Sequence, residues 1–304
     1  MLKQKIAVLG SGSIGKFHVR EFHNAGYEVT SILGSSIHSS KARAEELKKE
    51  FNIGVRPYFN LDTLLKNEKL DAVSVCTPAE LHSYQVRKCL ESNLHVFCEK
   101  PFVFDSLDNN YEIAKDLIKL SKDKGKILTV NNQLVSILEQ FPKHLKFGKI
   151  KTFSIYMESS IRETIKLISE AVPHMNSLLI RLISDKKISN IKFIDICDES
   201  AKIKFEYGEC NVEYNFKLKE DRPRKYNFSI NDVNFNKGGS YEQQKIIYGN
   251  RSFNIEDPLK ISIERFVSAL TGEGRPLITE YEILKNVEMQ DKIINAYLSQ
   301  NLKH

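Results

Sequence analysis

The stretch Lys5-Ile-Ala-Val-Leu-Gly-Ser-Gly-Ser-Ile-Gly15 decides the fold of this chain. Its apolar first half predicts a buried strand, and a helical pattern begins at its end. Each glycine has its own reason: Gly10 allows a tight turn, Gly12 lets backbone amides approach a pyrophosphate, and Gly15 lets the helix pack closely on the strand. Glycines in this strand–turn–helix context predict a dinucleotide-binding loop.

The start of this first helix, at Ser13 and Ile14, would turn its free N–H groups and the positive end of its dipole toward the phosphates. Two other interpretations remain open at this point. A glycine-rich turn without a ligand has the same pattern, and so does a site for flavin or another adenine-containing ligand.

The residues after this stretch alternate between short apolar runs and amphipathic segments. The pattern predicts strands over 27–33, 71–76 and 95–98, and helices over 41–51, 82–92 and 106–124. Strands that alternate with helices form βαβ units with a parallel sheet, and the ligands of such sheets bind beyond the carboxyl ends of the strands. We therefore expect an α/β fold with an N-terminal Rossmann dinucleotide-binding domain over residues 1–124.

The pattern changes after Gly125. One more short strand is expected over 127–130; beyond it, longer strands alternate strictly between apolar and charged residues, as in Ile203-Lys-Phe-Glu-Tyr207. They predict a large, mostly antiparallel open sheet, covered on its apolar face by a helix over 163–184. Residues 125–304 would form a C-terminal α+β domain for the substrate and for oligomerisation, whose last helix is a candidate to pack back on the Rossmann domain.

Composition argues against several classes of protein. The net charge of +6 is spread over every segment, so nucleic acid is not an expected partner. No stretch is apolar enough to span a membrane and the first residues lack the pattern of a signal peptide, so we expect no membrane partner and a cytoplasmic protein. The five cysteines match no zinc spacing, so we expect inert thiols in a reducing compartment and no metal site.

The end of the second predicted strand bears on the choice of cofactor. In NAD-binding domains an Asp or Glu here holds the ribose 2′-OH, but in this chain the residues are Gly34-Ser35-Ser36. A carboxylate would repel a 2′-phosphate, whereas a glycine and two hydroxyls would not, and Lys41 and Arg43 add positive charge shortly afterwards. The sequence favours NADP, with NAD as the alternative if these residues are merely a turn.

Further motifs carry a family resemblance. Cys76-Thr77-Pro78 and Glu99-Lys100-Pro101 each follow a predicted parallel strand. His18 lies behind the glycine loop, His82 follows the first motif, and His174 lies in a later helix. With these residues the chain resembles the glucose–fructose oxidoreductase / inositol dehydrogenase / MocA (Gfo/Idh/MocA) family over nearly its whole length. The resemblance implies a nicotinamide-dependent oxidoreductase whose second domain supplies most of the substrate site.

The resemblance also implies roles for single residues. Lys100 would reach the substrate from beside the nicotinamide, because hydride transfer at a carbon bearing oxygen also moves a proton, and a lysine in a closed cleft can carry it. The alternative is an ordinary surface lysine beside Glu99. The residues expected to line the cofactor, from the glycine loop and the resemblance together, are Gly10, Gly12, Ser13, Ile14, Gly34, Ser35, Ser36, Thr77, Pro78, His82, Glu99, Lys100 and Asn131, with Asn132 next to them and a cis bond before Pro101.

The second catalytic element departs from the family pattern. The segment Glu170-Ala-Val172-Pro173-His174-Met-Asn-Ser177 keeps the family histidine. Glu170, Val172 and Ser177 stand where the family has an Asp, a Gly and a further Asp. Residues four apart share a helix face, so Glu170 would orient or charge His174. Alternatively, Pro173 begins the helix and leaves Glu170 in the preceding loop, or His174 is a structural histidine.

These expectations lead to a function and its rivals. The leading hypothesis is an NADP(H)-dependent dehydrogenase or reductase of a small molecule: a sugar, a sugar nucleotide or a related polar carbonyl compound. Lys100 would move the proton and His174 would assist. Reduction of an imine or a tetrapyrrole is a close variant. The rival from another class is a dinucleotide-binding sensor or regulatory protein without turnover, which the altered residues around Val172 motivate.

Two expectations concern the rest of the second domain. Candidates for the substrate side, each with a structural role as the commoner alternative, are Tyr156, Glu158, Arg162 and Tyr241. Members of the family often associate through the open face of the C-terminal sheet. The charged residues of that face are Lys204, Glu206, Glu213 and Lys217. An interface on it would be polar and wet, so we expect a loosely held homodimer.

Overall fold

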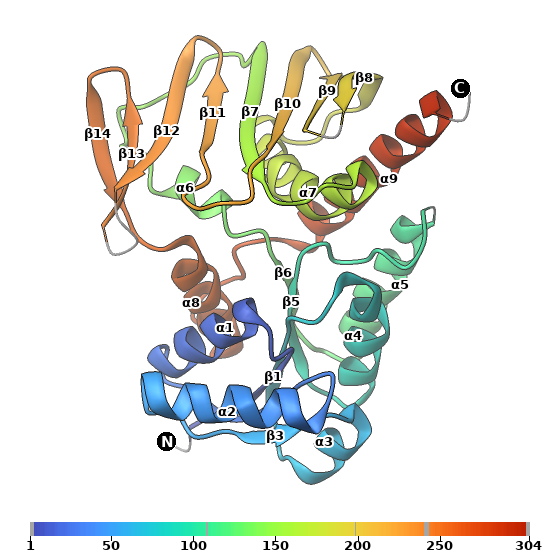
Figure 1. The fold of residues 1–304 in the computed structure, drawn as a ribbon, viewed down its shortest axis with the longest axis vertical. Helices are drawn as coiled ribbons and strands as arrows, with labels where there is room; N and C mark the ends of the chain where they lie inside the picture. The colour runs from blue at the N-terminus through green and yellow to red at the C-terminus, as the bar shows by residue number, and fades with distance from the viewer. Residues whose placement is uncertain (1–2, 108, 198, 240–242, 302–304) are drawn as a thin grey trace. The chain divides into compact units, whose positions relative to one another are not determined.

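The computed structural model describes residues 3–107, 109–197, 199–239 and 243–301 (Figure 1). Contacts group the chain into two compact units. The first consists of Met1–Asn132 with Leu259–Leu284, and the second of Gln133–Pro258 with Lys285–His304. Each unit has its own sheet and is described by itself.

The first unit is built on a six-stranded sheet in which neighbouring strands are parallel. The order β3-β2-β1-β4-β5-β6 reverses direction at β1 and β4, the point at which such sheets bind ligands. The strands are β1 (Lys5–Leu9), β2 (Glu28–Leu33), β3 (Arg56–Tyr58), β4 (Ala72–Val75), β5 (His95–Glu99) and β6 (Leu128–Asn131). The helices are α1 (Ser13–Asn24), α2 (Ile37–Phe51), α3 (Leu61–Asn67), η1 (Ala79–Leu81), α4 (His82–Glu91), α5 (Asn110–Asp123) and α8 (Pro258–Leu270). The predicted Rossmann fold is confirmed.

Aromatic side chains from three elements meet in the core of the first unit. Phe22 of α1 contacts Phe97 of β5 and Phe266 of α8 edge to face, with ring centroids 5.8 and 6.2 Å apart. All three are fully buried. The sequence suggests that the first domain ends at residue 124. In the structure the first unit also includes β6, which extends the sheet, and α8, which joins the core from a late part of the sequence. The element that returns to it is α8, whereas most of the last helix, α9 (Glu280–Asn301), belongs to the second unit.

The second unit is built on an eight-stranded sheet in the order β14-β13-β12-β11-β7-β10-β9-β8. Neighbouring strands are antiparallel except β7 and β10, which run parallel. The strands are β7 (Thr152–Ser159), β8 (Ile188–Cys197), β9 (Ser200–Tyr207), β10 (Cys210–Leu218), β11 (Tyr226–Ile230), β12 (Val233–Gly239), β13 (Gln244–Tyr248) and β14 (Arg251–Ile255). With α6 (Val135–Glu139), α7 (Thr164–Ile183) and most of α9, they confirm the predicted mostly antiparallel sheet.

Alternation along the strands gives this sheet a buried and an open face. Ile203, Phe205 and Tyr207 of β9 are buried, whereas Lys204 and Glu206 between them are accessible. Figure 1 shows α7 lying along one side of the sheet, and the buried Tyr214 hydroxyl of β10 donates to Asn176 Oδ1 of α7 at 3.1 Å. The apolar side chains of α7 and of alternate strand positions thus form the core of the second unit.

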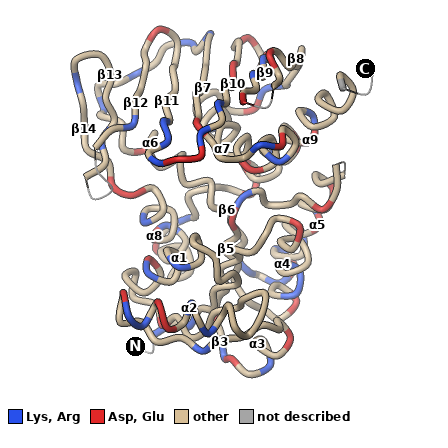
Figure 2. The backbone as a smooth tube through the Cα atoms, viewed as in Figure 1, with Lys and Arg blue, Asp and Glu red and all other residues tan. Residues whose placement is uncertain are grey.

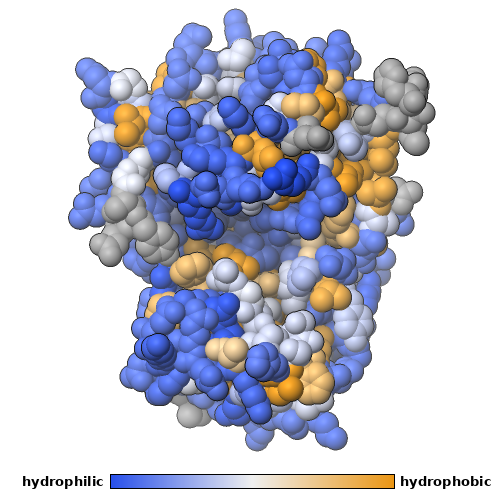
Figure 3. Space-filling model, viewed as in Figure 1, coloured by the Kyte–Doolittle hydropathy of each residue, from blue (hydrophilic) through white to orange (hydrophobic). Residues whose placement is uncertain are grey.

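Basic and acidic residues are interspersed along the chain in both units (Figure 2). The face displayed in the space-filling view is mostly hydrophilic, with scattered apolar residues (Figure 3). Among the described residues, no helix combines the length and the apolar character that crossing a membrane requires. Within the same residues, no group of three or more His, Cys, Asp or Glu side chains is arranged to hold a metal ion.

Candidate functional site

The glycine loop between β1 and α1 has one open position between two crowded ones. A Cβ on Gly10 would lie 2.4 Å from the Cys76 carbonyl oxygen, and one on Gly15 would lie 1.9 Å from the Gly10 carbonyl oxygen. A Cβ on Gly12 would meet no heavy atom of the described residues within 4 Å. Packing therefore requires Gly10 and Gly15, whereas the space in front of Gly12 is free for a ligand.

The amino terminus of α1 opens at this free space. Gly12 is its N-cap; among the described residues no side chain caps it, and its first turn holds no acidic residue. Ser13 is exposed, and Ile14 packs against the core. The N–H groups of a first helical turn have no partner within the helix, and with the dipole they favour an anion. The residues present fit the pyrophosphate of a dinucleotide.

Helix α2 supports the glycine loop from outside. Arg43 Nε donates a hydrogen bond to the Ser11 carbonyl oxygen at 2.8 Å, while its guanidinium pairs with Glu46. Lys16 Nζ lies 2.6 Å from a carboxylate oxygen of Glu46 and of Glu50. Both cations beside the loop are thus paired within the protein, and the backbone amides of the loop are the groups left to meet a phosphate.

The end of β2 explains the glycine that stands where NAD-binding domains carry an acid. A Cβ on Gly34 would lie 2.6 Å from Ser39 Oγ and 3.0 Å from Ser11 Oγ, so close packing excludes a side chain. Ser36 caps α2, because its Oγ accepts a hydrogen bond from the Ser39 N–H at 3.1 Å. Ser35 is exposed and is not part of this cap. The prediction that this turn accepts a 2′-phosphate therefore depends mainly on Ser35.

A buried ion pair lies at the carboxyl end of β5. His18 of α1 faces Glu99, with Nε2 2.8 Å from Oε1. The other ring nitrogen of His18 lies 2.8 Å from Ser74 Oγ and 3.2 Å from Cys76 Sγ. Asn131 of β6 donates Nδ2 to the same Glu99 oxygen at 2.6 Å. One helix and three neighbouring strand ends thus meet in a single polar cluster inside an apolar core.

The contacts of this pair set the charges that it carries. Burial alone would lower the pKa of His18, but the contacts with Cys76 and with the Glu99 carboxylate outweigh it and raise the pKa to about 10. Burial alone would raise the pKa of Glu99, but the contacts with His18, Lys100 and Asn131 lower it to about 2. His18 and Glu99 are therefore both ionised across the neutral range.

Lys100 follows directly from this cluster and is half-buried. Its backbone N–H donates to Glu99 Oε2 at 3.3 Å, and its bond to Pro101 is cis, as the resemblance implies. His82 lies between two loops: Nδ1 is 2.7 Å from the Pro101 carbonyl oxygen and Nε2 is 2.8 Å from the Thr77 carbonyl oxygen. Burial lowers the pKa of His82. These contacts make His82 a brace between the loops after β4 and β5.

The predicted amide residues at the end of β6 carry open hydrogen-bonding capacity. Oδ1 of Asn131 and Oδ1 of Asn132 are buried and have no hydrogen-bond partner among the described residues. The carboxamide of a nicotinamide has N–H groups that can donate hydrogen bonds to such oxygen atoms. Near the same cluster Thr77 donates its hydroxyl to Gln85 Oε1 at 2.7 Å, while Pro78 beside it is exposed. The open acceptors at this strand edge fit the carboxamide of a nicotinamide.

In the second unit, α7 presents two polar side chains from a buried stretch. Every residue from 167 to 180 is buried except Glu170 and His174, which are half-buried. The helix runs unbroken from Thr164 to Ile183 with Pro173 inside it. The interpretation that Pro173 begins the helix is therefore wrong, and Glu170 lies on the same helix face as His174.

The altered family positions of this helix serve its packing. Val172 is fully buried. Ser177 is buried as well, and its Oγ donates to the Pro173 carbonyl oxygen at 2.8 Å. Neither side chain is accessible to a substrate, so the departures from the family pattern concern the interior of the second unit.

The predicted catalytic residues fall into two groups. Lys100 belongs to the first unit, and Glu170 and His174 belong to the second. The structure therefore brings Lys100 together with the Glu99 cluster and brings Glu170 together with His174.

The candidates for the substrate side are held by partners of their own. Glu158 accepts a hydrogen bond from the Lys225 N–H at 2.7 Å, and its other carboxylate oxygen lies 3.3 Å from the Tyr156 hydroxyl. Arg162 pairs with Glu220. Tyr241 lies outside the described residues.

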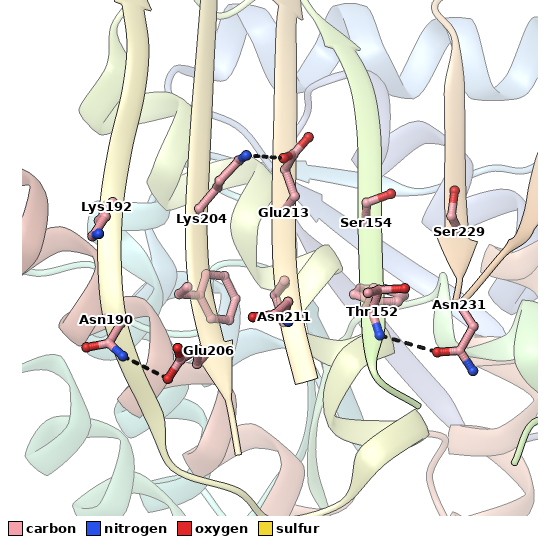
Figure 4. A pocket seen from close by; sticks show the side chains of 13 residues that line it. Thr152, Ser154, Asn190, Lys192, Lys204, Glu206, Asn211, Glu213, Ser229 and Asn231 are labelled. Carbon is pink, nitrogen blue, oxygen red and sulfur yellow. Dashed lines mark hydrogen bonds and ion pairs between the residues drawn. The ribbon is translucent and has the colours of Figure 1, made fainter. Parts of the chain in front are cut away.

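The open face of the second sheet holds a broad polar depression of about 760 Å³ (Figure 4). Lys204 Nζ lies 3.0 Å from a Glu213 carboxylate oxygen, and Asn190 Nδ2 donates to Glu206 at 2.8 Å. Figure 4 shows these side chains standing on neighbouring strands. Lys204 and Glu213 thus form an ion pair within the chain, and Glu206 accepts from a neutral amide.

Two residues of α9 had not been predicted from the sequence. Asn286 and Gln290 are buried, and their side-chain amides donate to backbone carbonyls of α7. The available signal was the placement of two amides four residues apart in a helix whose neighbouring positions are apolar.

Known proteins match the first part of the chain in sequence. Residues 4–132 match the GFO_IDH_MocA family model, described as an oxidoreductase family with an NAD-binding Rossmann fold. Inositol 2-dehydrogenase of Rhodococcus erythropolis is 37% identical over 120 residues, which are 39% of this chain and 33% of that protein. UDP-N-acetylglucosamine 3-dehydrogenase of Acidithiobacillus ferrooxidans is 27% identical over 132 residues, 43% of this chain and 38% of that one. The chain spans about a third of the length of the curated relatives it matches.

Solved structures extend the likeness in fold to nearly the whole chain. UDP-N-acetylglucosamine 3-dehydrogenase of Acidithiobacillus ferrooxidans has a TM-score of 0.76 at 17% identity, covering 97% of this chain and 98% of that one. Biliverdin reductase of Synechocystis, in complex with biliverdin and NADP+, has a TM-score of 0.70 at 18% identity, covering 96% and 98%. At these identities the likeness shows the fold alone. From the family match and the glycine loop it follows that residues 4–132 form a domain of the Gfo/Idh/MocA oxidoreductase family with an NAD-binding Rossmann fold.

Proposed function

We propose that this protein is an NAD(P)-dependent oxidoreductase that transfers hydride between nicotinamide and a polar alcohol or carbonyl compound. The observation that carries the proposal is the glycine loop, where the space in front of Gly12 meets the amino terminus of α1 and, within the described part of the chain, neither a neighbouring atom nor a side-chain cap fills it. The family match over residues 4–132 supports it. When bound, the nicotinamide supplies or accepts the hydride.

In this proposal Lys100 moves the proton that accompanies hydride transfer. The side chain is half-buried and starts at the strand end where the ionised Glu99 lies. His174 assists, with Glu170 on the same accessible face of α7. Lys100 in the first unit and His174 in the second are both titratable, and each is half-buried among buried neighbours, as a proton-transferring group requires.

A sugar or a sugar nucleotide is the proposed substrate class. The names of two relatives, inositol 2-dehydrogenase and UDP-N-acetylglucosamine 3-dehydrogenase, support this class. The test is a screen of myo-inositol and UDP-N-acetylglucosamine with NAD+ and NADP+, followed by the absorbance of the reduced nicotinamide, and of biliverdin with NADPH. Turnover with a sugar or sugar nucleotide is the expected result.

A Lys100→Ala variant separates an enzyme from a sensor. An enzyme should lose turnover by about a hundredfold or more while it keeps its cofactor affinity. Lys119→Ala, at an exposed lysine of α5, is the matched control and should keep both. A protein that binds the dinucleotide but turns over none of the compounds, with or without Lys100, would be a non-catalytic binding protein.

The finer proposal is a preference for NADP over NAD. The absence of an acid at the end of β2, the packing at Gly34 and the exposed Ser35 support it. Ser35→Asp should reverse the preference, because a carboxylate repels a 2′-phosphate and accepts a hydrogen bond from a 2′-OH. Comparable affinities of the unaltered protein for NADPH and NADH would contradict this preference.

The quaternary proposal is a weak homodimer through the open face of the second sheet. Support comes from the extent of the depression there and from the polar side chains that line it (Figure 4). Pairing of Lys204 with Glu213 within one chain argues for modest affinity. Light scattering should show dimers at a protein concentration of about 100 µM, which is high enough to detect a weak interface. A single monomer peak would contradict the proposal.

A further inference from the structure

Pro173 leaves a gap in the hydrogen bonding of α7. Proline has no N–H, so the carbonyl group four residues earlier, that of Ser169, loses its partner within the helix. Gln290 of α9 fills this gap, because its Nε2 donates to the Ser169 carbonyl oxygen at 3.0 Å. Gln290 and Ser169 are each 2% exposed, so the bond is made away from bulk solvent.

A second amide of α9 reaches the next turn of α7. Asn286 donates Nδ2 to the Pro173 carbonyl oxygen and to Ser177 Oγ, each at 2.7 Å. Asn286 is four residues before Gln290, so both amides lie on one face of α9. The neighbouring Val287 and Ile294 are buried apolar residues, which makes the two amides exceptions at this interface.

The two carbonyl groups are those that precede the two half-buried residues of the stretch 167–180 of α7. A peptide group is planar, so a bond to the carbonyl oxygen of one residue also fixes the backbone nitrogen of the next. The Ser169 carbonyl shares its peptide group with Glu170, and the Pro173 carbonyl shares its peptide group with His174. Glu170 and His174 are thus each attached to a peptide group that accepts a hydrogen bond from one amide of α9.

Repair of the helix accounts for only one of these amides. The Ser169 carbonyl needs a donor because Pro173 has no N–H, and Gln290 provides it. The Pro173 carbonyl already accepts the hydroxyl of Ser177, so it does not require Asn286. A buried amide costs free energy unless it is hydrogen-bonded, and a leucine would fill the same volume without that requirement. Asn286 therefore calls for a reason other than satisfying the helix.

We propose that Asn286 and Gln290 are positioning residues, which set the His174 and Glu170 side chains through the backbone of α7. This inference rests on the proposed function, in which His174 and Glu170 act on the substrate. Without Gln290 the Ser169 carbonyl loses its donor from α9, and without Asn286 the Pro173 carbonyl keeps the Ser177 hydroxyl but loses its link to α9. The backbone that carries Glu170 and His174 is then held less firmly, and the imidazole of His174 changes its orientation and surroundings. The glycine loop of the first unit is unaffected.

The test is the titration of the His174 imidazole in the full-length protein. It is followed by NMR with 15N-labelled histidine, and the His174 signal is assigned with His174→Gln. Asn286→Leu and Gln290→Met remove the amides with little change in volume. Gln300→Met is the matched control, because Gln300 also lies on α9 and donates Nε2 to a backbone carbonyl, that of Ile191, at 3.1 Å.

The titration midpoint of His174 is expected to move by about 0.5 pH unit or more in Asn286→Leu and Gln290→Met, and to stay in place in Gln300→Met. Melting temperatures are measured on the same samples. A fall in melting temperature without movement of the midpoint would show that the amides are merely structural, and would overturn the proposal.

A Pro173→Ala background keeps the test valid if loss of an amide prevents folding. Alanine restores an N–H for the Ser169 carbonyl, so the effect of Gln290→Met on His174 should disappear there. An effect that persists, or is absent in both backgrounds, overturns the proposal. Calorimetric titration of NADPH on the same samples separates the two claims, since failure to bind NADPH removes the proposed function and leaves the His174 result to stand on its own.

Discussion

The two units support their accessible polar groups by different chemistry. In the first unit the ion pair of His18 and Glu99 lies behind Lys100. In the second, the neutral amides of Asn286 and Gln290 hold the backbone that carries His174. A buried ion pair depends on the protonation of both partners, whereas an amide–carbonyl hydrogen bond does not titrate. The first support should therefore respond to pH, and the second should not.

The difference follows from what each element lacks. The end of β5 is already fixed by its pairing with β4 and β6, so an added ion pair changes the electrostatics near Lys100 more than the path of the chain. Helix α7 carries a proline and lacks a hydrogen bond, so it needs donors at fixed places. Charge is thus found at a strand end that strand pairing already fixes, and neutral amides are found where a helix backbone lacks a hydrogen bond.

Removal of one member of the ion pair should have the largest effect. His18→Leu leaves the Glu99 carboxylate buried without its cation, so the free energy of unfolding should fall by about 3 to 5 kcal/mol. Urea unfolding measures it. The matched control is His23→Leu, at an exposed histidine of the same helix, which should cost less than about 0.5 kcal/mol. Equal losses in the two variants would contradict the ion pair's role.

Removal of an amide in the second unit should cost less. Gln290→Met leaves the Ser169 carbonyl buried and without its donor, for a loss of about 1 to 3 kcal/mol in urea unfolding. Pro173→Ala restores an N–H for that carbonyl, so Gln290→Met should cost much less in this background. An unchanged cost would mean that Gln290 stabilises the unit by some other contact.

Stability as a function of pH should separate the two supports. The pKa of His18 is raised from 6.5 to about 10, so its stabilisation is complete below pH 6.5 and is lost as the pH rises toward 10. The pKa of Glu99 is lowered from 4.5 to about 2, so its stabilisation is complete above pH 4.5 and is lost as the pH falls toward 2. The free energy of unfolding should be greatest between pH 4.5 and pH 6.5 and should decline from pH 7 to 10.

The same two variants test this pH dependence. In urea unfolding, the decline between pH 7 and 10 should be much weaker in His18→Leu, while Gln290→Met should run parallel to the unaltered protein. If His18→Leu kept the full alkaline decline, another group would be its source and the contrast between the units would fail.

The smallest expected effect concerns two adjacent serines. Ser36 caps α2, so Ser36→Ala should lower the free energy of unfolding by about 1 kcal/mol. Ser35 is exposed and outside the cap, so Ser35→Ala should leave stability unchanged and weaken only NADPH binding. A comparison of thermal unfolding and cofactor titration checks both. Loss of stability in Ser35→Ala would show that the turn is purely structural.

Short-range patterns were enough to predict the fold. The glycine loop and the alternating strands predicted the Rossmann sheet and the mostly antiparallel second sheet, because a strand's neighbours in sequence determine its alternation. The sequence did not predict that α8 belongs to the first unit, because this depends on contacts between Phe266 and residues far away in the chain.

The candidate site was predictable residue by residue but not as a set of contacts. His18 and Glu99 were both singled out, yet nothing in the sequence showed that α1 brings one against the other. One of the two interpretations of the sequence had Pro173 begin a helix, the usual place for a proline. Pro173 lies inside α7, and Gln290 of α9 donates the hydrogen bond that the missing N–H of a proline cannot give to the Ser169 carbonyl. Gln290 is more than a hundred residues away in the sequence.

The most direct test of the account is a calorimetric titration of NADPH into the unaltered protein and into Gly12→Val. We expect binding by the unaltered protein and an affinity at least about tenfold lower in Gly12→Val, because the added side chain fills the space in front of the helix terminus. The melting temperature of that variant without ligand should be nearly unchanged, since a Cβ at this position meets no described atom. No binding by the unaltered protein, or equal binding by both, would contradict the account.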